Sequence, residues 1–142
     1  MQFLKAFIFV FVLAISSVYA QNLEELPLFS RTQLTYEGAF RINASVFGAS
    51  DINYSQGPIA YNAQNHSLFI VGHAHQQAIA EFAIPELVIS ETLGDLNMVE
   101  TPLQVFSEVL NRTPDNNPEG IDRIGGLYVV TDGGAQRLLV NA

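Results

Sequence analysis

The stretch from Gly57 to Gly72, GPIAYNAQNHSLFIVG, holds two short apolar runs on either side of a polar segment. The runs Ile59 to Tyr61 and Ser67 to Gly72 carry β-branched and aromatic residues, which strands favour. The segment Asn62 to His66 between them is rich in side-chain amides, and Asn in particular is typical of turns. This stretch therefore predicts a β-hairpin.

Similar runs, bounded by turn residues, extend outward from this hairpin in both directions. We expect further strands at Leu34 to Ile42, Ala78 to Ile84, Gly126 to Val130 and Arg137 to Val140. The connections Gly48 to Pro58, Gly72 to Gln77 and Thr131 to Gln136 are dense in turn-forming residues. The predicted fold class is therefore mainly β, with antiparallel sheets.

One segment departs from the β pattern. Thr101 and Pro102 have the order of an N-cap and a first-turn proline, and Gln104 stands where a capping-box partner would. Apolar residues then recur at helical spacing, namely Leu103, Phe106, Val109 and Leu110. We expect one short α-helix near residues 102–112.

The chain also contains a repeated sequence pattern. When Gly57 is aligned with Gly126, 69 residues later, both copies read as a Gly, a strand, a polar turn and a second apolar strand. Consecutive blades of a propeller begin in this way. The alternative is that two unrelated β-hairpins look alike at this level of pattern.

The residues Gly57 to Gly72, continued by Ile79-Ala80-Glu81-Phe82, resemble a blade of NHL-like and related β-propellers. The resemblance implies four-stranded blades around a central channel, of which this chain has room for about two. It matches no catalytic motif of the family, so it carries over no active-site residue. The 69-residue spacing exceeds the usual ~40 to 50 and implies an insertion.

A propeller closes with typically 4 to 8 blades, because each sheet covers its faces with its neighbours. The chain ends within or just after the apolar run Leu138 to Val140. We therefore expect residues 33–142 to be a β-propeller-like domain truncated at its C-terminus. The alternative is a complete small β-sandwich.

The amino-terminal segment has the features of a secretory signal. Lys5 precedes an apolar run from Ala6 to Ile15, and small residues follow up to Ala20. We expect residues 1–20 to be removed by cleavage between Ala20 and Gln21, and residues 21–32 to form an exposed leader. The alternative, an uncleaved anchor, needs ~20 apolar residues, so no stable membrane span is expected. The location predicted is secreted or periplasmic.

The composition narrows the range of possible binding partners. The net charge is −8, and loss of Lys5 makes it one unit more negative. Phosphate backbones would be repelled, which argues against nucleic acid and leaves a small molecule, a sugar or a protein as partner.

The chain has no cysteine, so stability must come from a packed core. No cofactor is predicted.

Two groups of residues are candidate ion sites. His73 and His75 alternate along the chain and could place both imidazoles on one face, ~7 Å apart, as ligands of a metal that Glu81 or Asp51 would complete. The alternative is a solvated pair in a turn.

Oxygen ligands for calcium are densest at Asp115, Asn117 and Glu119. The spacing fits no EF-hand loop, and the alternative is an acidic loop that serves solubility alone.

Four Asn-x-Ser/Thr sequences, at Asn43, Asn53, Asn65 and Asn111, would accept glycans in a eukaryotic secretory pathway. In a bacterium they would be turn residues. The chain has neither a Gly-x-Ser-x-Gly elbow nor a cysteine nucleophile, so no catalytic residue is predicted.

The sequence thus favours an exported β-propeller-like scaffold or binding module. The alternative is part of a propeller-fold hydrolase or lyase whose remaining catalytic residues lie beyond Ala142.

Signal cleavage has a direct test. Mass spectrometry of the exported product should find Gln21 at its amino terminus, in free or cyclised form, because the peptidase reads the small residues that end at Ala20. An exported product that begins at Met1 would contradict the prediction.

Overall fold

The computed structural model describes residues 29–112 and 117–142, so the predicted signal, its cleavage site and most of the leader lie outside the described residues. The chain divides into two units, Met1–Thr35 and Tyr36–Ala142. In the first unit, a 3-10 helix η2 (Arg31–Gln33) follows Ser30, whose backbone N–H donates to Gln33 Oε1 at 2.7 Å. The strands and the other 3-10 helices of the described residues all belong to the second unit.

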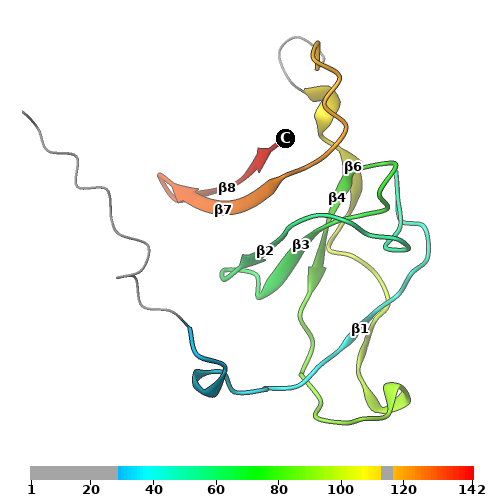
Figure 1. Cartoon of the computed structure of the whole chain (residues 1–142), viewed down its shortest axis with the longest axis vertical. Coiled ribbons are helices and arrows are strands. Elements are labelled where there is room, and N and C mark those ends of the chain that lie inside the picture. The colour runs from blue at the N-terminus through cyan, green and yellow to red at the C-terminus, as the bar shows by residue number, and fades with distance from the viewer. Residues whose placement is uncertain (1–28, 113–116) are drawn as a thin grey trace, which may run out of the picture. The chain divides into compact units, whose positions relative to one another are not determined.

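The second unit is built on a four-stranded antiparallel sheet. Its order is β2 (Ile59–Asn62), β3 (Ser67–Val71), β4 (Ala78–Ala83) and β6 (Gln104–Glu108), coloured green to yellow in Figure 1. Three of these strands confirm the predicted apolar runs. The mainly β class and the antiparallel pairing are confirmed as well.

One face of this sheet is covered by the segment before β2 and by the β4–β6 connection. There β1 (Arg41–Ile42) pairs in parallel with β5 (Met98–Val99). The core on this face centres on Phe82 and Phe106, whose ring centroids lie 5.9 Å apart in an edge-to-face arrangement. The predicted strand Leu34 to Ile42 is correct only at its last two residues.

The other face of the sheet packs against a second antiparallel hairpin, β7 (Gly126–Asp132) and β8 (Ala135–Asn141), drawn in orange and red in Figure 1. Val71, Ile79 and Ile124 form the buried centre of this second core. Gln77 Oε1 accepts a hydrogen bond of 2.8 Å from the Ile124 backbone and so fixes the connection that enters β7. The four-stranded sheet is therefore covered on one face by the segments that carry β1 and β5 and on the other by the β7–β8 hairpin.

The two hairpins share one register. Ala60 pairs with Phe69, and 69 residues later Val129 pairs with Leu138. The offset predicted from the sequence is thus also the offset of strand pairing. Phe69 and its counterpart Leu138 both pack into the core between the layers, so equivalent faces of the two hairpins are turned toward each other.

The predicted helix over residues 102–112 is wrong. The segment forms β6, and a three-residue 3-10 helix η4 (Leu110–Arg112) follows. Pairing with β4 supplies backbone hydrogen bonds that override the local helical preference. A β-bulge in β6 adds one residue and interrupts the strict alternation, so the apolar side chains take a spacing that resembles that of a helix.

Among the described residues, the remaining helical element is η3 (Leu93–Asp95), another 3-10 turn. Across residues 29–112 and 117–142, none of the helices has the length and apolar character needed to cross a bilayer.

Gly72, which directly follows β3, lies close to the segment before β2 and to Phe106. A Cβ at this position would lie 2.6 Å from Ser50 Oγ and 2.8 Å from a ring carbon of Phe106. At Gly126 the nearest atom would be 3.5 Å away, an ordinary contact.

We therefore expect Gly72→Ala to lower the free energy of unfolding by about 1–3 kcal/mol, the usual cost of overpacking. Gly126→Ala should change it by roughly 0.5 kcal/mol or less. Urea unfolding followed by circular dichroism measures both, and equal effects of the two substitutions would contradict the packing described.

Candidate functional site

The site begins with the alternation of β4. Ala78, Ala80 and Phe82 point into the first core, whereas Ile79 packs in the second core, beneath the hairpin. Successive side chains of a strand point to opposite faces. Glu81 therefore lies on the hairpin side of the sheet, where its side chain is 1% exposed.

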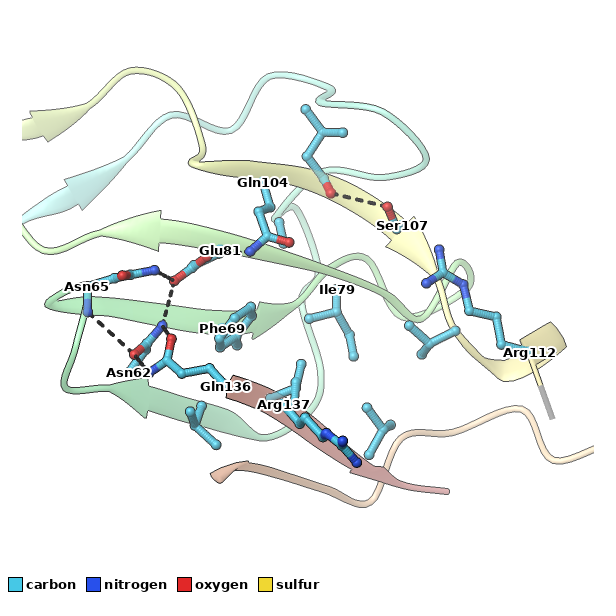
Figure 2. Close-up of a pocket in the computed structure, with 16 residues that line it drawn as sticks. Asn62, Asn65, Phe69, Ile79, Glu81, Gln104, Ser107, Arg112, Gln136 and Arg137 are labelled. Carbon is cyan, nitrogen blue, oxygen red and sulfur yellow. Dashed lines mark hydrogen bonds between the residues drawn. The ribbon is translucent and has the colours of Figure 1, made fainter. Parts of the chain in front are cut away.

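The Glu81 carboxylate is bound by side chains from each neighbouring segment of the sheet. Its Oε1 accepts hydrogen bonds from Asn62 Nδ2 at 2.9 Å, from Asn65 Nδ2 at 3.0 Å and from Ser67 Oγ. Its Oε2 accepts one from Gln104 Nε2 at 2.6 Å. Figure 2 shows three of these donors, Asn62, Asn65 and Gln104, near the carboxylate. All of them are neutral groups.

The bulge in β6 brings Gln104 to this carboxylate. Ile79 pairs with Ser107, so an uninterrupted register would place Val105 opposite Glu81. The extra residue shifts the register and places Gln104 there instead. An amide donor thus takes the position that a valine would otherwise occupy.

These contacts determine the charge of the group. Burial raises the pKa of Glu81, but the hydrogen bonds from Ser67, Asn65, Asn62 and Gln104 together outweigh burial, and the pKa lies below its ordinary value of 4.5. Hydrogen bonds donated to a carboxylate stabilise its ionised form. Glu81 is therefore a buried negative charge at neutral pH.

The same network joins the two layers. Asn62 Nδ2 also donates to Gln136 Oε1 at 3.2 Å, and Gln136 Nε2 donates to Asn62 Oδ1 at 2.7 Å. Gln136 belongs to β8 and Asn62 to β2. This reciprocal amide pair connects the hairpin to the group that holds Glu81.

Beside the network lies a cavity of about 560 Å³ between the sheet and the hairpin. Figure 2 shows its polar residues at one end, namely Asn62, Asn65, Glu81, Gln104 and Gln136. Its walls are apolar and include Phe69, Ile79, Val109, Val129 and Leu138. Arg112 lies at the other end in the figure, and Arg137 adds a second cation from β8.

The two cavity arginines differ from the other arginines of this unit. Arg41 and Arg123 donate to backbone carbonyls of the protein itself. Within the described part of the chain, the guanidinium groups of Arg112 and Arg137 have no hydrogen-bond or ion-pair partner. In a chain with 14 acidic residues, the cavity is thus lined by two cations that no described residue pairs.

This arrangement is suited to binding rather than to acid–base or nucleophilic chemistry. None of the described histidines lines the cavity, and the Ser107 hydroxyl there approaches only the Val105 carbonyl, at 3.5 Å. Glu81 accepts three hydrogen bonds at Oε1 and one at Oε2, which hold it as a fixed acceptor rather than as a group that exchanges a proton. The cavity therefore offers fixed polar groups, a feature of ligand pockets.

The predicted histidine pair lies elsewhere. The rings of His73 and His75 are 5.2 Å apart, and His73 Nδ1 accepts a hydrogen bond from the His75 backbone at 3.1 Å. Asp51, one of the residues expected to complete a site, accepts from the Asn53 backbone. Within residues 29–112 and 117–142, no group of three or more His, Asp or Glu side chains is placed to hold a metal ion.

The predicted calcium loop is described only in part, because Asp115 lies outside the described residues. Asn117 Oδ1 accepts from the Ile121 backbone at 2.9 Å, while Glu119 is exposed. The calcium site stays a prediction.

The four sequence sites for glycans differ in how their amide nitrogens are used. Those of Asn43, Asn65 and Asn111 donate to glutamate carboxylates, and that of Asn53 donates to the Ala44 carbonyl. Asn65 therefore serves the buried network, and a glycan on its nitrogen would remove one donor to Glu81.

In the sequence, Glu81 stands out as a complement to the histidine pair and as part of the propeller-like stretch, whereas Asn62 and Asn65 are expected in a turn, with Asn65 also a glycan acceptor. One signal could have singled Glu81 out, namely a single acid between apolar neighbours in a strand predicted to be buried.

Comparison of the chain with protein-family models, with curated proteins and with solved structures finds no match.

The buried carboxylate makes stability depend on pH. Because the folded-state pKa of Glu81 is lowered, its contribution is complete above the unfolded pKa of about 4.5 and is lost as pH falls through the folded value. We expect Glu81→Gln to lower the free energy of unfolding at pH 7 by roughly 1–3 kcal/mol, since it replaces hydrogen bonds to a charged group.

The difference between the wild type and Glu81→Gln should shrink as pH falls from 5 to 3. Exposed Glu86 provides the matched control, and Glu86→Gln should follow the wild-type curve. Chemical unfolding at several pH values measures all three proteins. A Glu81→Gln variant as stable as the wild type at pH 7 would contradict the account.

Proposed function

We propose that the protein is an exported binding module that holds a small polar molecule in the cavity between the sheet and the β7–β8 hairpin. The observation that carries this proposal is the convergence on one cavity of a buried carboxylate held by neutral donors, several amides, and two arginines without a partner among the described residues. Export rests on the signal features of residues 1–20.

The size of the cavity supports the proposal. Its volume of about 560 Å³ falls within the ~300–1,000 Å³ of small-molecule sites. Such sites combine apolar walls with a few fixed polar groups that set orientation, as Phe69 and Leu138 on one hand and Gln104 and Gln136 on the other do here.

The cost of the network also supports it. Burying a carboxylate is unfavourable unless hydrogen-bond donors compensate for the lost water, and an apolar side chain in its place would avoid that cost. The fold brings in donors from β2, β3 and β6 and from the turn that follows β2 in order to keep Glu81. A ligand site gives this arrangement a use.

Binding can be tested without knowledge of the natural ligand. A library of small polar fragments, followed by ¹H–¹⁵N NMR, should shift the side-chain amide signals of Gln104 and Gln136. The Ser107→Trp variant should abolish these shifts, because Ser107 lines the cavity opposite Ile79 and an indole would fill the space.

Tyr128→Trp is the matched control, since Tyr128 is 66% exposed on the outer face of the hairpin and does not line the cavity. It should bind the fragments as the wild type does. If no fragment shifts the cavity amides, or if Ser107→Trp binds them unchanged, the proposed function is wrong.

A further inference from the structure

The two ends of the cavity have opposite hydrogen-bonding character. At the Glu81 end, Oε2 accepts one hydrogen bond, although a carboxylate oxygen has room for about two. Gln104 Nε2 donates a hydrogen bond to Glu81 Oε2, so the amide oxygen of Gln104 is turned away from the carboxylate. No described residue donates a hydrogen bond to this oxygen. This end offers acceptors and a negative charge, and it suits a cationic donor such as an ammonium group.

The opposite end offers donors and positive charge. Arg112 follows β6 in the 3-10 helix η4, and its guanidinium has no partner within the described residues. A guanidinium presents a fork of N–H donors that matches a carboxylate with two parallel hydrogen bonds. This end therefore suits a ligand carboxylate.

The distance between the ends sets the length of the ligand. Glu81 pairs with Gln104, and Ala78 pairs with Glu108 shortly before Arg112. The stretch of β4 from Ala78 to Glu81, which runs alongside the cavity from the Arg112 side to the Glu81 side, covers ~10 Å at ~3.4 Å per residue and gives the scale of the separation. A single amino acid is too short to reach both ends, whereas three extended residues span ~10 Å.

The net charge of the protein selects among possible ligands. At −8, the protein repels a purely anionic ligand over long range, but a zwitterion carries no net charge and is not repelled. The walls between the two ends are apolar, with Phe69, Ile79 and Leu138 among them. Apolar side chains of the ligand would pack there.

Building on the proposed function, we infer that the cavity binds a short peptide of about three residues with both termini free. The amino terminus meets Glu81 and Gln104, and the carboxylate meets Arg112. Apolar side chains along the peptide fill the walls.

The test uses the tripeptide Ala-Leu-Ala and two blocked forms, one acetylated at the amino terminus and one amidated at the carboxyl terminus. Isothermal titration at pH 7 is carried out in 150 mM salt, where the Debye length of ~8 Å screens the net charge of the protein. The free tripeptide should bind at least tenfold more tightly than either blocked form, because each block removes one charged contact.

Variants of the protein test whether Arg112 binds the carboxylate of the peptide. Arg112→Gln should weaken the free tripeptide and leave it no tighter than the amidated form. Arg123→Gln, an exposed arginine outside the cavity, should keep the tenfold preference of the wild type. The amino end is tested by the acetylated peptide alone, so the result does not depend on whether a Glu81 variant folds.

The outcomes separate the two claims. If polar fragments shift the cavity amides but the free tripeptide fails to bind, or binds no better than the blocked forms, the peptide inference is overturned and the binding module stands. Tripeptide binding that Ser107→Trp leaves unchanged also overturns it, because the peptide then lies outside the cavity.

Discussion

An ionised carboxylate buried in an apolar sheet is the constraint on which the rest of this structure depends. Glu81 is 1% exposed, and its partners are neutral groups rather than a cation. An isolated buried charge would cost many kcal/mol, so the surrounding chain must supply hydrogen bonds in fixed positions. That requirement explains the polar turn after β2, the bulge in β6 and the amide pair that holds β8.

The same constraint shapes the cavity. Because Asn62 binds both Glu81 and Gln136, the layer that carries the carboxylate and the hairpin that covers it are connected at one end. At that end the space between the layers is polar, and farther along it is walled by Phe69, Ile79 and Leu138. Arg112 and Arg137 supply positive charge there that no described side chain neutralises.

Alternation and turn residues predicted the strands well, because β2, β3, β4 and the β7–β8 hairpin follow patterns set within each segment. The bulge in β6 could not be predicted from patterns within the segment, since it depends on pairing with β4. The apolar residues of this segment also have a spacing like that of a helix. The network escaped prediction because Glu81, Asn62 and Gln136 meet only after folding. The propeller resemblance stays a prediction.

The central claim is that Glu81 is held ionised inside the folded protein by its neutral donors. A ¹³C NMR titration of the Glu81 side-chain carboxyl, in protein that remains folded over the pH range, measures this directly. The account predicts a midpoint below the ordinary value of 4.5. A midpoint at or above that value would show that burial outweighs the hydrogen bonds and would contradict the account.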